Sequence, residues 1–320
     1  MAMSKIFKLS STFKILWEAL SIFTKNVRSL LPIMLVKLLF SSLFFLLNYL
    51  SIIPILTELT SSFVSLSIFD AKSPEYSSVL FTIRKDVREI TTIGSILLVS
   101  SFIVSSFITM TIIHVISMAY SEKKQTPQEV FSFIKKSWKG PMLTQLCASI
   151  VSIAVGFIIL VIVISFIMVS IGSFGYTAVA VLLAILAIPL YLYFALICSL
   201  SIVISVVEEE CYGIAAFGRS VELTKGRRQS GILIMFVIAV SSGIISTAYN
   251  FSMLYASSKT FVALVIGFCY VAMLVMMTIL VQVINTVIYY EWKSWGKELL
   301  DVEGGLGYTS TFKEEYVSIP

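Results

Sequence analysis

Long apolar runs alternate with short charged segments along the chain. Six of these runs contain the roughly 20 apolar residues that a helix needs to cross a bilayer. The runs lie at residues 30–56, 92–120, 142–171, 176–207, 230–256 and 260–290. Open sheet edges are excluded from lipid, so continuous apolar runs predict α-helices. The pattern therefore predicts an all-α, polytopic membrane protein with six transmembrane helices.

Composition and charge support a bilayer as the main solvent of the chain. Hydrophobic residues make up 58% of the sequence and charged residues only 13%, too apolar a mixture for an ordinary soluble domain. If the six spans alternate in direction, 17 of the 23 Lys and Arg residues fall on the side that carries both termini. Lys and Arg are retained in cytoplasmic loops, so both termini are expected in the cytoplasm. The same bias explains the basic loops without a nucleic-acid partner.

Three amphipathic segments interrupt the apolar pattern, at residues 12–24, 127–138 and 213–225. Apolar side chains at helical spacing predict a lipid- or core-facing stripe on each. In the first segment the predicted stripe is Phe13, Leu16, Trp17, Leu20 and Phe23; in the third it is Ile214, Phe217 and Val221. Each segment ends at a Lys-Asn or Lys-Gly junction and precedes two spans. The chain therefore predicts three units, each a cytoplasmic elbow helix followed by a helical hairpin, in a pseudo-threefold arrangement.

The predicted organisation has three parts. Residues 1–29 form a cytoplasmic N-terminal segment with an amphipathic helix, residues 30–291 the six-span integral membrane domain, and residues 292–320 a cytoplasmic tail. The longest polar interval, residues 57–90, is expected on the far side as a small cap or a solvated connector, with a short helix at 76–89. The tail ends in Tyr316-Val317-Ser318-Ile319, which fits a tyrosine-based sorting signal for a vesicle coat adaptor.

Motifs that support catalysis or metal binding are missing from the sequence. Cys147, Cys198 and Cys269 fall within spans and Cys211 in a loop, so no disulfide or zinc framework is expected. No HExxH, GxSxG or phosphate-binding loop occurs. The three acids at 208–210 are expected at the positive N-terminal end of the helix that follows. These features predict a non-enzymatic protein without a cofactor or a metal.

Five polar side chains inside the spans form one candidate site. They are Lys37, His114, Gln145, Gln282 and Asn285. An ionisable group within a membrane is a candidate functional residue, and these five side chains could line a shallow polar cavity open to the cytoplasm. The alternative is that they form hydrogen bonds between helices while Lys37 snorkels to the headgroups. No carboxylate lies at mid-membrane depth, which disfavours proton- or sodium-coupled transport.

The basic elbows form the second candidate site. Their cations are Lys25, Arg28, Lys139, Arg219, Lys225, Arg227 and Arg228. Polybasic segments beside a bilayer bind anionic headgroups, and they can also recruit a membrane-protein partner; alternatively, these helices only fix topology and brace the bundle. The function predicted on this basis is the organisation or trafficking of membrane components through the elbow helices. The alternative function is a small-solute or lipid carrier that uses the polar cavity.

Three sequence segments carry a family resemblance: WEALSIFTKN, VEEECYGIAAFGRSVELTKGRRQSGILI and YYEWKSW. With them the chain resembles a plant family of uncharacterised six-span membrane proteins. The resemblance implies this fold and placement in an endomembrane (ER or Golgi) or the plasma membrane. In layout the chain is also similar to the membrane domain attached to some bacterial glycerophosphodiester phosphodiesterases. That activity does not carry over, because the chain has no soluble catalytic domain and its single histidine is His114.

Overall fold

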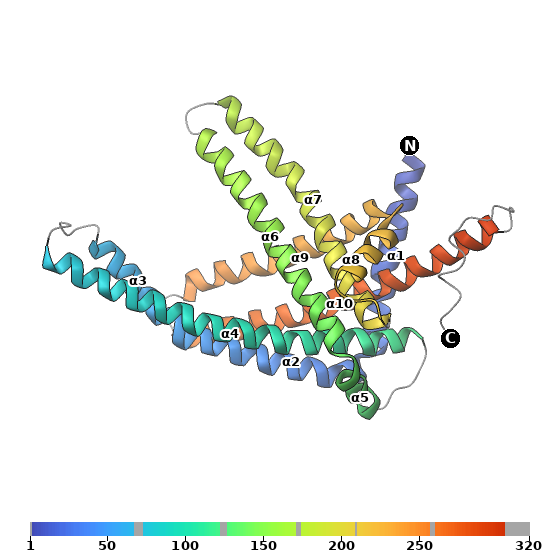
Figure 1. Ribbon diagram of the computed structural model, residues 1–320, viewed down its shortest axis with the longest axis horizontal. Coiled ribbons are helices and arrows are strands. Elements are labelled where there is room, and N and C mark those ends of the chain that lie inside the picture. Colours follow the sequence, from blue (N-terminus) through green and yellow to red (C-terminus); the bar gives the residue numbers. More distant parts are fainter. Residues whose placement is uncertain are drawn as a thin grey trace.

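The computed structural model describes residues 2–66, 73–121, 127–170, 174–208, 210–256 and 260–304, and every regular element in these ranges is a helix (Figure 1). In chain order the elements are α1 (Ala2–Lys25), α2 (Val27–Leu47), the π-helix η1 (Asn48–Ile52), α3 (Ile53–Leu66), α4 (Pro74–Tyr120), α5 (Pro127–Ser137), α6 (Lys139–Ser170), α7 (Phe174–Val207), α8 (Ile214–Thr224), α9 (Arg228–Ala256) and α10 (Thr260–Gly304).

Six helical segments in the described part are long and apolar enough to cross a membrane. They are Val27–Leu66, Pro74–Tyr120, Lys139–Ser165, Ile185–Val207, Arg228–Tyr255 and Phe261–Trp295. Each coincides with one of the six apolar runs of the sequence. The predictions of an all-helical chain and of six candidate membrane-spanning helices are therefore confirmed.

Two helices differ in extent from the sequence prediction. The expected short helix at 76–89 is the beginning of α4, which continues without a break to Tyr120. Its start is fixed by Pro74 in the first turn and by Ser73, whose hydroxyl accepts a hydrogen bond from the Tyr76 amide at 3.1 Å. At the other end of the chain, α10 continues through residue 292, where the tail was expected to begin, to Gly304. The candidate sorting signal at 316–319 lies outside the described residues.

The π-helix η1 interrupts the first apolar run and has a local cause. Pro54 lies two residues beyond η1 and has no amide hydrogen to donate to the carbonyl four residues earlier. A wider turn before the proline removes the clash between its ring and the preceding turn. The span therefore continues from α2 into α3 without an unpaired break in lipid.

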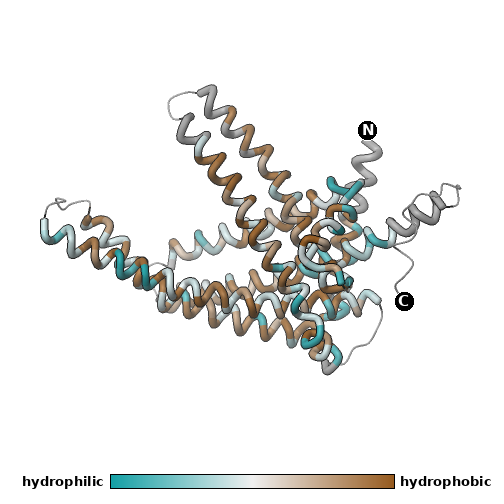
Figure 2. Tube along the Cα trace, in the orientation of Figure 1, coloured by the Kyte–Doolittle hydropathy of each residue, from teal (hydrophilic) through white to brown (hydrophobic). Residues whose placement is uncertain are grey.

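Three pairs of helices diverge from one shared end of the molecule (Figure 1). The segment α2–η1–α3 packs along α4, α6 packs along α7, and α9 packs along α10. The shared end, called the hub below, consists of α1, α5 and α8 together with the adjoining ends of the longer helices, at about residues 12–34, 106–121, 130–148, 192–235 and 271–295. Figure 2 shows apolar residues along the diverging pairs and polar residues concentrated at the hub and on the outer part of α4.

Most of the protein core lies near the hub. Buried apolar side chains occur on α4 from Ile108 to Ile116, on α7 from Leu192 to Val206, and on α10 from Val271 to Trp292. The parts of the long helices beyond the hub, called the outer shafts, are different. In α6, only 6% of the most apolar stretch is buried. Lipid tails solvate exposed Leu, Ile and Phe as well as a protein core does, so the shafts gain little hydrophobic energy by packing together.

The pair formed by α3 and α4 extends farther from the hub than α9 and α10 do. Tyr120 of α4 stacks on Tyr290 of α10 with ring centroids 4.6 Å apart, which sets these two residues at one level. From that level α4 reaches back to Pro74 and α10 to Thr260, a difference of about 16 residues or ~24 Å of helix. The interval 57–90 is therefore mainly a helical arm rather than an irregular connector.

The packing of α2 against α10 can be tested at a close contact between Gly267 and Phe45. A Cβ atom added to Gly267 would lie 2.6 Å from Cε1 of Phe45, whereas one added to Gly243 on α9 would meet nothing within 4 Å. We expect Gly267→Val to lower the free energy of unfolding by about 1–3 kcal/mol, because the Phe45 ring must leave its site. The matched variant Gly243→Val has the same change in helix propensity without the clash, so it should leave stability nearly unchanged. Thermal unfolding in detergent, followed by circular dichroism, compares the two; equal losses would contradict the α2–α10 contact.

Candidate functional site

A charged cluster at the hub joins three helices through Glu208, the residue that follows α7. Its Oε1 atom accepts hydrogen bonds from the Tyr289 hydroxyl at 2.7 Å and from Lys293 Nζ at 2.8 Å, both on α10. Its Oε2 atom lies 3.9 Å from Nε of Arg219 on α8. We call Glu208, Arg219, Tyr289 and Lys293 the clamp. It connects α7, α8 and α10 at one carboxylate.

Local structure accounts for the geometry of the clamp. Tyr289 and Lys293 are four residues apart on α10, so they share one face of the helix, and Lys293 Nζ also contacts the Tyr289 hydroxyl at 2.7 Å. After α7 the chain turns sharply, with positive φ angles at Glu210 and Gly213. The Gly213 amide donates to Thr144 Oγ1 of α6 at 2.8 Å, which holds the turn against the bundle.

The clamp corrects the sequence prediction for the acids at 208–210. Glu208 was expected near the N-terminal end of the following helix, but its carboxylate faces α10 and Arg219 instead. Burial by itself raises the pKa of Glu208, yet hydrogen bonds from Lys293 and Tyr289, together with the charges of Lys293 and Arg219, bring that pKa below its ordinary value. The carboxylate is therefore ionised at neutral pH and balances the cations beside it.

A second cluster joins α1, α4 and α10. The carboxyl group of Glu18 on α1 faces Glu291 on α10, and Lys14 Nζ lies 3.4 Å from Glu291 Oε1. Burial, and then the charge of Glu291, raises the pKa of Glu18. Next to this pair, the Tyr290 hydroxyl is 2.5 Å from the Ser117 hydroxyl of α4. Two carboxyl groups thus share one exposed lysine.

The predicted headgroup-binding cations all lie at the hub, but they fall into two groups. Lys25, Arg28, Lys139 and Lys225 are exposed. The other three contact hub side chains: Arg219 pairs with Glu208 and Glu222, Arg227 lies over the Trp295 ring at 4.4 Å, and Arg228, itself exposed, lies over the Tyr193 ring at 5.5 Å. The first group is therefore the free basic surface, and the second helps to hold the hub together.

The buried face of α8 differs from the predicted stripe. Ile214 is 87% exposed, and the side chains that pack inward are Ala216, Ser220 and Thr224. Small and hydroxyl-bearing residues allow helix backbones to approach closely, which is how α8 fits against α7. Ile214 therefore does not belong to the face of α8 that packs inside the protein, and that face was not identified from hydrophobicity because its residues are small. At the predicted Lys-Gly junction that ends this helix, Gly226 has a φ of 83°, a left-handed conformation that favours glycine.

On α1 the predicted apolar face is divided between two environments. Thr12, Ile15 and Ala19 are buried against the core. Phe13 and Trp17, expected on the same face as Leu16, are 70% and 66% exposed. On α5, similarly, Phe131 is 72% exposed. Several large apolar side chains of the amphipathic helices therefore remain uncovered at the hub.

The five residues of the predicted polar cavity are mostly buried. Asn285, His114 and Lys37 are 0%, 6% and 7% exposed, and Gln145 and Gln282 are half-buried. The His114 ring stacks on Phe133 of α5 at a centroid distance of 3.8 Å. Lys37 Nζ, Gln145 Oε1 and both amide atoms of Asn285 are buried without a hydrogen-bond partner in the structure. The alternative in which Lys37 snorkels to the headgroups does not fit the structure, because its amine is enclosed.

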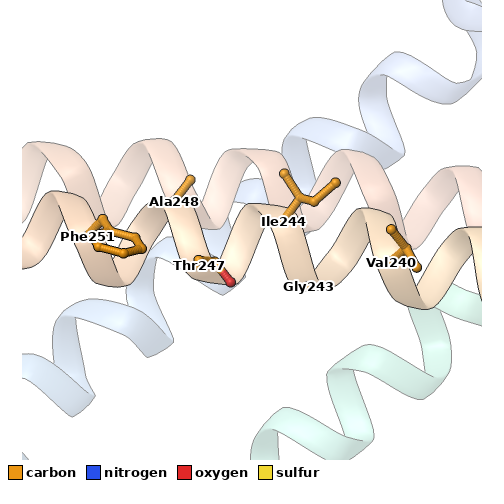
Figure 3. Close-up of a pocket in the computed structure, with 6 residues that line it drawn as sticks. All are labelled: Val240, Gly243, Ile244, Thr247, Ala248 and Phe251. Carbon is orange, nitrogen blue, oxygen red and sulfur yellow. The ribbon is translucent and has the colours of Figure 1, made fainter. Parts of the chain in front are cut away.

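A groove on α9 lies apart from these residues (Figure 3). It is lined by Val240, Gly243, Ile244, Thr247, Ala248 and Phe251 and has a volume of about 510 Å³. Its lining is apolar apart from the Thr247 hydroxyl, so it offers no acid, base or nucleophile for chemistry. In the described ranges, no group of three or more His, Cys, Asp or Glu residues is placed to hold a metal ion.

Removal of the charge at the centre of the clamp tests its contribution to stability. Glu208→Gln leaves Lys293 and Arg219 without their shared counter-charge, and we expect it to lower the free energy of unfolding by about 1–3 kcal/mol. Glu222→Gln breaks only an exposed contact with Arg219 and should cost less than about 0.5 kcal/mol. Because the pKa of Glu208 is lowered on folding, its contribution is present above the unfolded pKa of about 4.3 and is lost as the pH falls through the folded value. Thermal unfolding should show a smaller difference from wild type at pH 3 than at pH 7.

The Glu18–Glu291 pair has the opposite pH dependence. A raised pKa on folding favours protonated Glu18, so its contribution to stability is present below the unfolded pKa and is lost as the pH rises through the folded value. We therefore expect Glu18→Gln to raise the melting temperature at pH 8 and to leave it unchanged at pH 4. Glu58→Gln, at an exposed site on α3, is the control. A Glu18→Gln variant that is less stable than wild type at pH 8 would contradict this account.

The comparison with known proteins identifies one family. The model of the family described as Domain of unknown function (DUF8558) matches residues 4–320. No curated protein and no solved structure matches the chain. The match includes both the hub and all six candidate spans, so one family accounts for the whole fold described above. The chain belongs to the DUF8558 family.

Proposed function

We propose that the protein is a non-enzymatic membrane scaffold that binds anionic lipid headgroups through its hub and thereby organises or traffics membrane components. The observation that carries the proposal is that exposed aromatic side chains and exposed cations occur together on and beside the amphipathic helices of the hub. Phe13, Trp17 and Phe131 are among the most exposed large apolar residues in these helices. Lys25 at the end of α1, Lys139 two residues after α5 and Lys225 directly after α8 are exposed as well.

Membrane interfaces explain this combination of side chains. Outside the hydrocarbon core, an exposed Phe or Trp is favourable where it can enter the headgroup region, and a cation beside it can pair with a phosphate. Polybasic segments gain about 1 kcal/mol per Lys or Arg near an anionic surface. The hub offers both kinds of group on neighbouring elements, so it fits an anionic leaflet better than a neutral one.

The orientation and repeat pattern belong to the same proposal. The excess of Lys and Arg at the hub side supports a cytoplasmic hub with both termini in the cytoplasm. In chain order α1, α5 and α8 each precede a pair of apolar helices, which supports three elbow-and-hairpin units. Placement in a plant endomembrane or the plasma membrane, and a coat-adaptor partner for Tyr316, rest on the sequence resemblance and motif alone.

One observation favours the carrier as a second candidate function. Lys37, Gln145 and Asn285 have buried polar atoms without a hydrogen-bond partner in the structure, and such atoms are costly unless water or a ligand reaches them. A carrier would use them along a path from the hub into the bundle. Solute flux in liposomes that is lost on changing Lys37 or His114 would favour this function over the scaffold.

Headgroup binding can be tested with two matched triple variants. We expect Lys25→Ala/Lys139→Ala/Lys225→Ala to weaken binding to vesicles containing phosphatidylserine and a phosphoinositide about 100-fold, since three cations contribute roughly 1 kcal/mol each. The comparison variant, Arg84→Ala/Lys85→Ala/Arg88→Ala, removes three exposed cations from the far arm of α4. It should retain wild-type affinity. Flotation of the purified full chain in nanodiscs with labelled vesicles measures both variants.

The outcomes separate specific from general attraction. Equal losses in both variants would mean that net charge alone drives the association and would contradict a headgroup-binding hub. No binding by the wild-type protein to any anionic vesicle would overturn the proposed function. Phosphatidylcholine vesicles give the baseline in each case.

A further inference from the structure

Lys37 lies on the face of α2 that packs into the bundle. Leu30 is fully buried on the same stripe, and Met34, Leu38 and Phe45 pack against the core at helical spacing around it. The neighbouring Val36, by contrast, is 49% exposed. Lys37 itself is 7% exposed, and its Nζ atom is buried with no hydrogen-bond partner. The amine therefore points into the protein and away from lipid.

Two ring contacts give the depth of this amine. Helices α2, α4 and α10 pack against one another (Figure 1). Phe45 of α2 contacts Phe268 of α10 with centroids 5.7 Å apart. Since these helices run antiparallel, Lys37 lies level with about residue 276 of α10, on the order of 20 Å from the level of Tyr290 at the hub. The stacking of Tyr120 on Tyr290 places about residue 106 of α4 at the same depth as Lys37.

The described candidate spans supply no carboxylate at this depth. Within the described candidate spans the acidic residues are Glu58, Glu75, Asp86, Glu89 and Glu291. Glu89 is the acid of α4 closest to residue 106, and Glu291 belongs to the hub; both are more than ~20 Å from the level of Lys37 along the helix axes. At the level of the lysine, α10 presents Val275 and α4 presents Ser106, both buried.

An enclosed lysine without a partner is energetically unfavourable in either protonation state. A charged ammonium in a low-dielectric interior costs several kcal/mol unless a counter-charge compensates it, and a neutral amine still leaves donors unpaired. Water could satisfy the donors but would not neutralise the charge. A small anion does both, since it accepts hydrogen bonds from Nζ and balances its charge. Ser106, whose hydroxyl donates to its own helix at 2.8 Å, can rotate to provide a second donor.

We propose that Lys37 forms an anion-binding site between α2, α4 and α10, which takes a small inorganic anion such as chloride. The approach from the hub suits this ligand. Arg28 is exposed at the hub end of the same helix, nine residues before Lys37. Its charge raises the local anion concentration there, at the entrance to the site. Asn285, level with about residue 28 of α2, has an unpaired amide donor at the depth of this entrance. The site uses none of the hub cations removed in the headgroup-binding test.

The site is tested by its effect on stability at constant ionic strength. Purified full-length protein in detergent is unfolded thermally in sodium gluconate, with stepwise replacement by chloride, nitrate or phosphate. An anion that binds only the folded state raises the melting temperature, and we expect a rise of roughly 2–5 °C for at least one of these anions. Lys37→Met should abolish the rise, and Lys37→Arg should retain it. Lys136→Met, at an exposed lysine of α5, controls for general salt effects.

A direct binding measurement makes the result independent of how the variants fold. Radiolabelled chloride and phosphate are bound to immobilised wild-type protein and displaced by unlabelled anion. Saturable binding by the wild type that is lost in Lys37→Met and kept in Lys136→Met is the expected result. Absence of saturable binding, equal melting temperatures in all four salts, or a stability rise that persists in Lys37→Met would each overturn the proposal. Vesicle binding by the Lys37→Met variant should match wild type, so failure of this proposal is distinguishable from failure of the headgroup proposal.

Discussion

The structure depends on a few polar and close-packed contacts at the hub, because apolar helices in a bilayer have little hydrophobic driving force to associate. Lipid tails are as apolar as leucine side chains, so helix pairing in a membrane relies on close packing and on hydrogen bonds. One turn of α10, residues 289–293, provides most of these contacts. Tyr289 and Lys293 bond to Glu208 after α7, Tyr290 contacts α4, and Glu291 pairs with α1. Trp292 is 3% exposed and packs against Gly231 of α9.

A single helical turn can reach so many partners because successive side chains point about 100° apart around the axis. The same geometry explains why the helix pairs diverge beyond the hub. Away from residues 289–293, α10 contacts its neighbours through apolar side chains, such as Phe268 against Phe45 of α2. The polar contacts are therefore concentrated at one end of the fold, while the apolar stretches of α6 and α9 are largely exposed.

Sequence patterns predicted the spans well because a helix that crosses a bilayer needs a long apolar run, which hydropathy measures directly. They were less informative about which residues touch. Glu208 and Lys293 are 85 positions apart, and each had a local explanation: Glu208 as an acid near the N-terminal end of a helix, and Lys293 as a basic residue after a span. The packed face of α8 was missed because Ala216, Ser220 and Thr224 are small rather than hydrophobic. For α8, a search for small residues at spacings of four would have found the buried face.

For Lys37, likewise, the sequence indicated the depth along the helix but not the direction in which the side chain points. Its distance from Arg28 along α2 allowed snorkelling, but distance along a helix says nothing about the side to which a residue points. In the structure Leu30, Met34 and Leu38 lie on the packed face, and Lys37 belongs to it; the sequence of α2 does not distinguish this face, because apolar residues occur on all sides of the helix. The hub balances its buried charge internally, since Glu208 faces Lys293 and Arg219. The bundle interior has no such partner for Lys37 among its described residues, so its stability depends on a group from outside the chain. That dependence distinguishes the two sites: the carboxylate of Glu208 is balanced by cations of the chain itself, whereas Lys37 requires a ligand.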